Sequence, residues 1–351
     1  MVAITPPTIH QLSGAIRCSL IALLLLFLTA CSEKHLPETS VELASKGLYT
    51  AALAKNAEWA IAGSIFQGGS LWRVADGERL YNWNHTADTA EGILLFSDIA
   101  ANNTRAITAD ESTLVLWDIG SGEASRFWTS PAKILDVALL YDGRYVAMGL
   151  ADQSAVIFDA IKGGITRTFR HDGKVHSVAV SDDQTQLLTG SEDRTAVLWR
   201  ISDGERLLTI NHEEEVQFVA LSHDGHYALT AAQYDKAELW DTQSKARLGS
   251  ISMKKQRLSL GLRITASTFN QDNTLLLLAY SNRTVELRNV NSLDIIDQWI
   301  LPRRNQWQPT STAALDVAFD PQDGLFYAIS SDGFLHHLRL HSSSSAVFPD
   351  S

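Results

Sequence analysis

The feature that most constrains the fold is a repeat of about 41 residues that fills most of the 351-residue chain. Each clear copy contains a short strand with an aromatic residue at its centre. These aromatic residues occupy positions 72, 117, 158, 199 and 240. Two weaker copies follow at wider spacing, Glu286-Leu287-Arg288 and His337-Leu338-Arg339. A repeat unit of this size buries its apolar face only against its neighbours, so seven stacked units are expected.

Each unit is expected to form four short strands. In the fourth unit these cover residues 175–181, 186–190, 195–201 and 206–211, with a turn at Asp203-Gly204 before the last strand. Alternating apolar residues, β-branched residues and regularly spaced turns indicate an all-β fold. Radial repetition of such units predicts a seven-bladed β-propeller of four-stranded antiparallel blades.

The last unit lacks a fourth strand of its own. Its third strand ends near Arg339, and the polar segment that starts at His341 is a poor strand. We expect residues 40–45 to supply the missing strand, so that an N-terminal strand closes the last blade and leaves no open sheet edge. The propeller then spans residues 40–340, and residues 341–351 form a polar tail.

Several positions resemble WD-repeat propellers. Trp-Asp pairs occur at Trp117-Asp118 and Trp240-Asp241, and a His lies 28 residues before Trp199 and before Trp240. The resemblance implies a hydrogen-bonded structural network of Asp, His, Ser or Thr, and Trp inside a blade. The residues that match this network are His171, Thr189, Asp193 and Trp199 in the fourth unit, and His212, Thr230, Asp235 and Trp240 in the fifth.

The N-terminus has the pattern of an export signal. Residues 1–30 contain no acidic residue, and an apolar run after Arg17 is too short to span a bilayer comfortably. It ends in Leu28-Thr29-Ala30-Cys31, which resembles the lipobox of bacterial lipoproteins. The resemblance implies a signal peptide over residues 1–30, lipidation of Cys31 and a tether over 31–39. An ordinary secretory signal and an uncleaved anchor are the alternatives.

The resemblance to lipoproteins also implies a location. The ring would be lipid-anchored in the bacterial cell envelope and face the periplasm. Ser32 follows the lipidated cysteine, where an Asp would resemble a signal for retention in the inner membrane. The outer membrane is therefore favoured.

Charge and cysteine content exclude two classes of protein. The formal net charge of −11 argues against nucleic acid as the main partner, because phosphate binding needs a cationic surface. Two cysteines form at most one disulfide, which excludes a disulfide-stapled scaffold. No phosphate-binding loop or zinc-protease motif is present, and we expect no cofactor.

Three groups of residues could carry chemistry. His171, Thr189 and Asp193 have the residue types of a nucleophilic triad, but their recurrence in the next unit favours the structural network. The histidines at positions 336, 337 and 341 could suggest a metal. However, neighbouring strand residues point to opposite faces, so no metal site is predicted. Asp136 and Asp316 occupy equivalent first strands and are expected near the channel as separate carboxylates.

The longest links between units carry a basic patch. Between Asp241 and Asp272 the chain has no acidic residue, and both long links should lie on one face of the disc. We predict a partner-binding patch there, because Arg and Trp are favoured at interface hot spots. Ordinary solvated loops are the alternative. The predicted patch consists of Lys254, Lys255 and Arg257 in one link, and Arg303, Arg304 and Trp307 in the next.

These features together predict a monomeric, membrane-tethered scaffold without catalytic activity. It would bind an acidic protein partner or an anionic envelope polymer on the face with the long links. Two alternatives remain open: a periplasmic enzyme with a site at the mouth of the propeller channel, and an outer-membrane assembly scaffold.

Overall fold

The computed structural model describes residues 34–64, 68–85, 93–253, 262–305, 312–322 and 324–341. The chain divides into two units, residues 1–34 and His35–Ser351, and the second is the ring described below. Within the described ranges no helix is long and apolar enough to cross a membrane.

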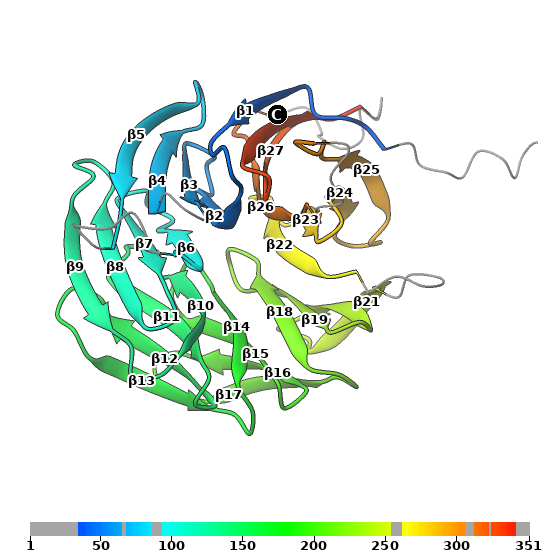
Figure 1. Cartoon of the computed structure of the whole chain (residues 1–351). Coiled ribbons are helices and arrows are strands. Elements are labelled where there is room, and N and C mark those ends of the chain that lie inside the picture. The colour runs from blue at the N-terminus through cyan, green and yellow to red at the C-terminus, as the bar shows by residue number, and fades with distance from the viewer. Residues whose placement is uncertain are drawn as a thin grey trace, which may run out of the picture. The chain divides into compact units, whose positions relative to one another are not determined.

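The second unit is a ring of seven four-stranded sheets, as Figure 1 shows. In each blade the first strand lies at the channel, and the chain moves outward strand by strand through antiparallel pairs. This confirms the predicted seven-bladed β-propeller. Blades 1 to 3 contain the strands β2 (Leu48–Leu53), β3 (Trp59–Ser64), β4 (Gly68–Arg73), β5 (Glu78–Trp83), β6 (Phe96–Ile99), β7 (Arg105–Ala109), β8 (Thr113–Asp118), β9 (Ala124–Thr129), β10 (Ile134–Leu139), β11 (Tyr145–Leu150), β12 (Ser154–Asp159) and β13 (Ile165–Arg170).

The remaining blades continue the same order, except that blade 7 takes its outermost strand from the N-terminal side of the chain. Blades 4 to 7 contain the strands β14 (Val175–Val180), β15 (Gln186–Ser191), β16 (Thr195–Arg200), β17 (Arg206–Asn211), β18 (Val216–Leu221), β19 (Tyr227–Ala232), β20 (Lys236–Asp241), β21 (Ala246–Ser252), β22 (Ile264–Phe269), β23 (Leu275–Tyr280), β24 (Thr284–Asn289), β25 (Ile295–Ile300), β26 (Ala314–Phe319), β27 (Leu325–Ser330), β28 (Phe334–Arg339) and β1 (Thr39–Glu42).

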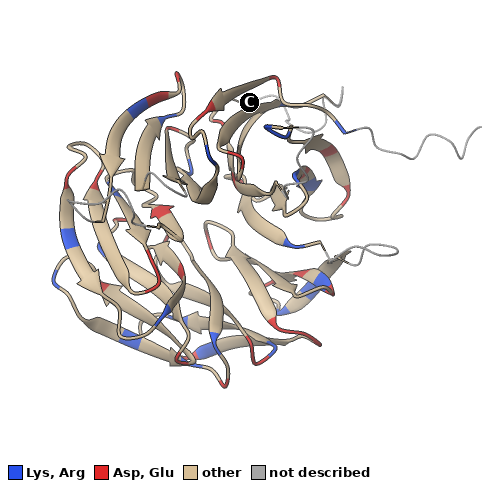
Figure 2. Ribbon diagram, viewed as in Figure 1, with Lys and Arg blue, Asp and Glu red and all other residues tan. Residues whose placement is uncertain are grey.

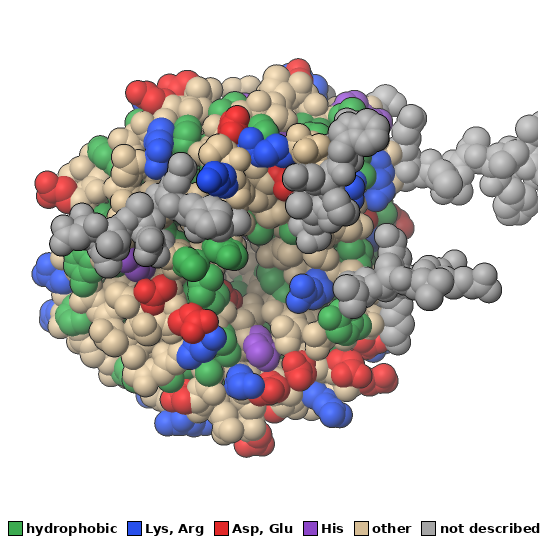
Figure 3. Space-filling view, in the orientation of Figure 1, with side chains coloured by type: hydrophobic (Ala, Val, Ile, Leu, Met, Phe, Trp, Pro, Cys, Tyr) green, Lys and Arg blue, Asp and Glu red, His purple; other side chains and the backbone are tan. Residues whose placement is uncertain are grey.

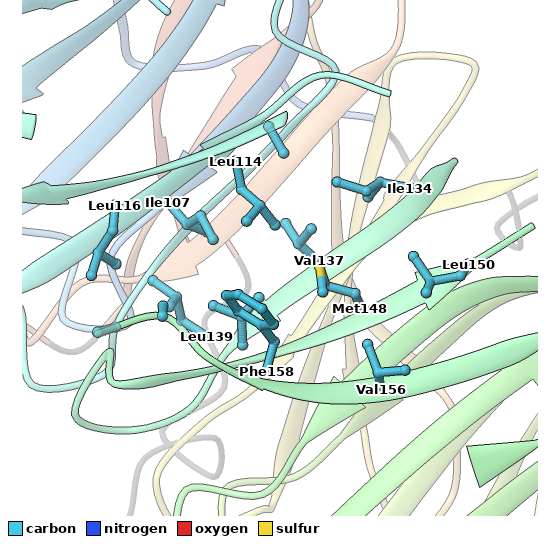
Figure 4. Packing of buried hydrophobic residues seen from close by; sticks show 14 residues of the cluster. Ile107, Leu114, Leu116, Ile134, Val137, Leu139, Met148, Leu150, Val156 and Phe158 are labelled. Atoms are coloured by element: carbon cyan, nitrogen blue, oxygen red, sulfur yellow. The ribbon is translucent and has the colours of Figure 1, made fainter. Parts of the chain in front are cut away.

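The hydrophobic core lies between neighbouring blades. Figure 4 shows one such interface, where Leu114 and Leu116 of blade 2 pack against Val137, Met148 and Phe158 of blade 3. The middle strands have apolar residues on both sides, so both faces of each sheet are covered. Each blade therefore contributes one face to each of two inter-blade cores, which explains why the repeat is stable only as part of a ring.

Strand β1 closes the ring by pairing with β28, from Thr39↔His337 to Glu42↔Phe334. This confirms the predicted closure, although the strand begins at Thr39 and ends at Glu42. The backbone N–H groups of Leu43 and Ala44 then donate to the carbonyl of Gly333 at 2.8 and 3.1 Å. A Cβ at Gly333 would lie 2.2 Å from the Ala44 carbonyl oxygen, so this close approach requires glycine.

The two faces of the disc differ in their connections. On one, the link face, the outermost strand of each blade joins the innermost strand of the next. The other, the turn face, carries the turns between first and second strands and between third and fourth strands. The predicted basic patch lies in links between blades 5, 6 and 7, and so belongs to the link face.

Candidate functional site

The innermost strands of all seven blades surround a central cavity of about 520 Å³. Figure 3 shows a hollow near the centre of one face. Its lining includes the acidic residues Asp98, Asp136 and Asp316, together with apolar residues and with other polar residues such as Lys55, His176 and Gln217. The sequence placed Asp136 and Asp316 near the channel and did not single out Asp98.

Each of these carboxyl groups connects two neighbouring blades. Asp98 accepts the backbone N–H of Leu139 at 2.6 Å, and Asp136 accepts that of Val178 at 2.9 Å. Asp316 accepts the N–H of Leu53 at 2.6 Å across the boundary between blades 7 and 1. The second oxygen of each carboxyl accepts the N–H of the next residue in its own strand. These contacts fix the first strands of adjacent blades to each other.

Burial makes these three carboxyl groups weaker acids than an exposed aspartate. It raises the pKa of Asp98 to about 6, and that of Asp136 and of Asp316 to about 7, against the hydrogen bonds that favour ionisation. The charge of Asp98 adds to the effect at both other residues. A folded-state pKa above the unfolded value means that the folded ring binds more protons, so its stability falls as pH rises through these values.

This predicts a loss of stability on the alkaline side of pH 6.5. Burial lowers the pKa of His171, His212 and His336, so these rings are neutral there and contribute no opposing change. Between pH 6.5 and 8, ionisation of each carboxyl with a pKa of about 7 should lower the free energy of unfolding by about 1 kcal/mol. The melting temperature, followed by Trp fluorescence, should fall by about 4 °C over this range. Asp136→Asn should remove about half of the fall.

The exposed turn residue Asp203 provides the control for this experiment. Hydrogen bonds from Glu205 and Arg200 lower its pKa, so it stays ionised throughout this range. Asp203→Asn should leave the pH dependence unchanged. A melting temperature of the native chain that is constant between pH 6.5 and 8 would contradict the assignment of weakly acidic channel carboxyls.

A second cavity, of about 640 Å³, lies at the mouth of the channel on the turn face. An ion pair between Lys55 and Asp182 crosses this mouth from blade 1 to blade 4. His223 Nδ1 lies 3.2 Å from the other carboxylate oxygen of Asp182, and its Nε2 donates to the Phe269 carbonyl at 2.9 Å. Burial opposes ionisation of Asp182, but these two partners lower its pKa overall. The arrangement connects blades 1, 4, 5 and 6 at the mouth.

The residues matched to the WD-type network of blade 4 are joined in the structure. His171 Nδ1 lies 2.8 Å from Asp193 Oδ2, and its Nε2 lies 2.7 Å from Thr189 Oγ1. The indole N–H of Trp199 donates to the same hydroxyl at 2.8 Å. Burial lowers the pKa of His171 in spite of Asp193, so a neutral ring donates to the carboxylate and accepts from the hydroxyl. All groups satisfy one another inside a single blade, which is a structural arrangement.

Blade 2 contains the His–Thr–Trp part of this network, which sequence analysis missed, but His85 Nδ1 has no hydrogen-bond partner among the described residues. His85 Nε2 lies 2.8 Å from Thr108 Oγ1, and the indole N–H of Trp117 donates to that hydroxyl at 2.7 Å. Asp110 Oδ2 is 3.8 Å from His85 Nδ1. The His lies 32 residues before the Trp instead of 28, because the preceding link is longer. Only Thr108 and Asp110, which lie shortly before Trp117 in the sequence, could have indicated this network.

In blade 5 the network is incomplete. His212 Nε2 and Thr230 Oγ1 are 2.9 Å apart, as in blade 4. The buried indole N–H of Trp240 has no hydrogen-bond partner among the described residues, which differs from the arrangement implied by the resemblance. Asp235 is buried and lies one residue further along its turn than Asp193 does in blade 4, and His212 Nδ1 has no hydrogen-bond partner among the described residues. The shifted position of the Asp accounts for the missing Asp–His bond.

Of the predicted partner-binding patch, only Arg303 and Arg304 lie within the described residues. Lys254, Lys255, Arg257 and Trp307 fall outside them. Figure 2 shows basic and acidic residues distributed around the whole ring. Arg303 is exposed, as a partner-binding residue would be.

Arg304 has a different role from the one that sequence analysis expected. Its guanidinium donates to Glu42 at 2.7 Å, to the carbonyl of Ala44, and to the carbonyl of Asp332 at 2.9 Å. It also lies 4.4 Å above the ring of Phe334. These partners belong to the closing strand and to the turn that it meets, so Arg304 stabilises ring closure. It is therefore a poor choice for a fold-neutral substitution in the patch.

A neighbouring cation on the link face was not predicted. Burial lowers the pKa of Arg283, and the positive charge of Arg303 lowers it further. Arg283 lies in the turn between β23 and β24 and donates to the Leu301 carbonyl at 2.9 Å. The negative charge of Asp332 opposes this shift, and the net positive charge of the three groups favours a further anionic group beside them.

The histidines of β28 take part in packing and hydrogen bonds. His336 is fully buried, with Nδ1 2.7 Å from Ser40 Oγ and Nε2 3.1 Å from Ser330 Oγ. His337 packs edge-on against Tyr327, with ring centroids 4.8 Å apart. The two rings point to opposite faces of the strand, which the alternation of side chains predicted.

A family model described as "WD domain, G-beta repeat" matches residues 163–200, which contain the complete network of blade 4 from His171 to Trp199. No curated protein matches the chain.

Proposed function

Because the chain is a WD-repeat β-propeller, we propose that it acts as a non-enzymatic scaffold that holds or recruits a partner protein. Propellers of this class mediate protein–protein interaction in general. The observation that carries the proposal is the closed ring, in which the channel carboxyls join neighbouring blades and the network side chains pair within single blades. Such a scaffold leaves its loops free to vary and to bind.

The proposed setting is the bacterial cell envelope. Cys31 lies outside the described residues, and its lipidation rests on the lipobox-like Leu28-Thr29-Ala30-Cys31. The chain would face the periplasm, with the outer membrane favoured by Ser32. His35, four residues after Cys31, already pairs with β25, so a short tether would hold the ring close to its membrane.

The proposed binding surface is the link face between blades 5, 6 and 7. Arg303 is exposed there beside Arg283, and their mutual repulsion favours an acidic partner or an anionic envelope polymer. Lys254, Lys255, Arg257 and Trp307 belong to the same two links in the sequence. Arg304 is left out of this surface because its guanidinium is bound within the ring.

The test is crosslinking in cells followed by mass spectrometry of the captured proteins. The double substitution Lys254→Glu and Arg303→Glu changes one residue in each link and should reduce recovery of the partner about tenfold, since rim charges steer association. Cys31→Ser should move the chain out of the membrane fraction and abolish capture of a membrane-bound partner.

The matched control reverses the charge of two exposed lysines in turns on the opposite face, by the substitutions Lys162→Glu and Lys245→Glu. It should capture the partner at the native level. Equal recovery from both double variants would remove the link face from consideration.

One observation favours the enzymatic alternative. The channel cavity contains three carboxyl groups, and two of them have a pKa of about 7, a value suited to general acid–base catalysis. Against this, both oxygens of each carboxyl accept a backbone N–H group, and the bond from the next blade gives each carboxyl a structural role in joining two blades. The scaffold is therefore the better-supported function.

A further inference from the structure

The two ends of the described ring meet at the outer edge of blade 6. His35 and His341 lie against Asp297, a buried residue of the outermost strand β25. Figure 1 shows the N-terminal segment passing β25 before it reaches β1. These residues are far apart in sequence, and sequence analysis grouped His341 only with its neighbours on β28.

The backbone fixes each of the three side chains in place. Both backbone groups of His35 bond to β25. Its N–H donates to the Gln298 carbonyl and its carbonyl accepts the Ile300 N–H, both at 2.9 Å. The N–H of His341 donates to Asp297 Oδ2 at 2.7 Å. Asp297 Oδ1 accepts the N–H of Gln298 at 2.8 Å, so each carboxylate oxygen retains a free lone pair.

The distances between the side chains fit a shared ion better than direct hydrogen bonds. His35 Nε2 is 3.5 Å from Asp297 Oδ1, and His341 Nδ1 is 3.8 Å from Asp297 Oδ2. Hydrogen bonds between such groups are about 2.7–3.0 Å long. Two ligands of one tetrahedral zinc ion lie about 3.4 Å apart. All the donor atoms lie within 4.8 Å of one another, and the imidazole rings stack with centroids 3.9 Å apart.

We propose that His35, Asp297 and His341 form a binding site for a divalent transition-metal ion of the zinc type. Two imidazoles and one carboxylate are a donor set that such ions prefer, whereas Mg²⁺ and Ca²⁺ prefer oxygen ligands alone. The side chains of His35 and His341 are 30% and 40% exposed, so an ion can enter and water can complete its coordination.

The site joins three parts of the ring. A bound ion connects the segment before β1, the outermost strand of blade 6 and the segment after β28. It would therefore resist separation of both chain ends from the ring, and binding to the folded state alone stabilises that state. The inference does not depend on the proposed partner or on the lipid anchor.

The experiment measures binding of zinc to the full chain after removal of metals with a chelator. Zn²⁺ at a hundredfold excess over its dissociation constant should raise the melting temperature by about 5 °C. Mg²⁺ at the same concentration should have no effect. Co²⁺ should give visible absorption bands that report imidazole and carboxylate coordination.

Single substitutions identify the ligands. Asp297→Asn, His35→Gln and His341→Gln should each weaken Zn²⁺ binding at least about tenfold. The two histidine variants change partly exposed side chains, so they remain informative if the substitution of the buried aspartate prevents folding. Far-UV circular dichroism of each variant without metal reports whether the fold is intact.

His226 provides the matched control, because its Nε2 lies 3.2 Å from Asp241 Oδ2 without a second imidazole. His226→Gln should retain the native response to Zn²⁺. The proposal is overturned if Zn²⁺ leaves the melting temperature of the native chain unchanged. It is equally overturned if the three ligand variants respond as the native chain does.

Discussion

Deleting residues 38–46 should lower the melting temperature by about 10 °C or more. The deletion removes β1 and the buried residues Leu43 and Ala44 that follow it, which pack in the core between blades 7 and 1. Loss of one buried Leu alone costs about 2–5 kcal/mol. The deletion also exposes the edge of β28 and leaves the buried ring of His336 without its Ser40 partner.

Thermal unfolding followed by Trp fluorescence measures this effect. Thr39→Ala, which changes an exposed residue at the start of the same strand, is the control and should leave the melting temperature unchanged. Size-exclusion chromatography should also show that the deleted chain self-associates, because an unpaired strand edge can pair with another molecule. A deletion variant that is monomeric and has the same melting temperature as the native chain would show that β1 does not close the ring.

The second large effect is expected for Thr189→Val. Thr189 is fully buried, and its hydroxyl is shared by His171 and the indole N–H of Trp199. Valine has nearly the same shape but leaves both of these polar groups unpaired inside the blade. Each unpaired group costs about 1–3 kcal/mol, so the free energy of unfolding should fall by about 4 kcal/mol.

Thr230→Val in blade 5 is the matched comparison. Its hydroxyl meets only His212, because the N–H of Trp240 has no partner among the described residues in the native structure. The expected loss is therefore about 2 kcal/mol, half that at Thr189. Urea unfolding of both variants gives the two free energies. Equal losses would contradict the difference between the networks of the two blades.

The repeat pattern made the fold predictable, because each unit carries its own strand alternation and turns. Ring closure was also predictable, since the last unit visibly lacked a strand. The network of blade 2 was missed because its His lies in a link whose length differs from the others. Spacing is informative about a contact only where the intervening links have constant length.

The candidate sites were less predictable because they join different blades. Arg304 has the sequence context of a surface loop, yet its partners Glu42 and Ala44 are about 260 residues away. Asp98 occupies a first strand of only four residues, and its role depends on the N–H of Leu139 in the next blade. No local pattern records contacts of this kind.

The sequence by itself determined the number of blades, the strand that closes the last of them and the network within blade 4. These follow from local alternation, turns and repeated spacing, which act over a few tens of residues. The tertiary structure alone decided that Arg304 stabilises the closure, that three aspartates each join two neighbouring blades at the channel, and that His35, Asp297 and His341 meet. Closing the ring brings the first and last blades together, and only that closure creates contacts between the two ends of the described ring.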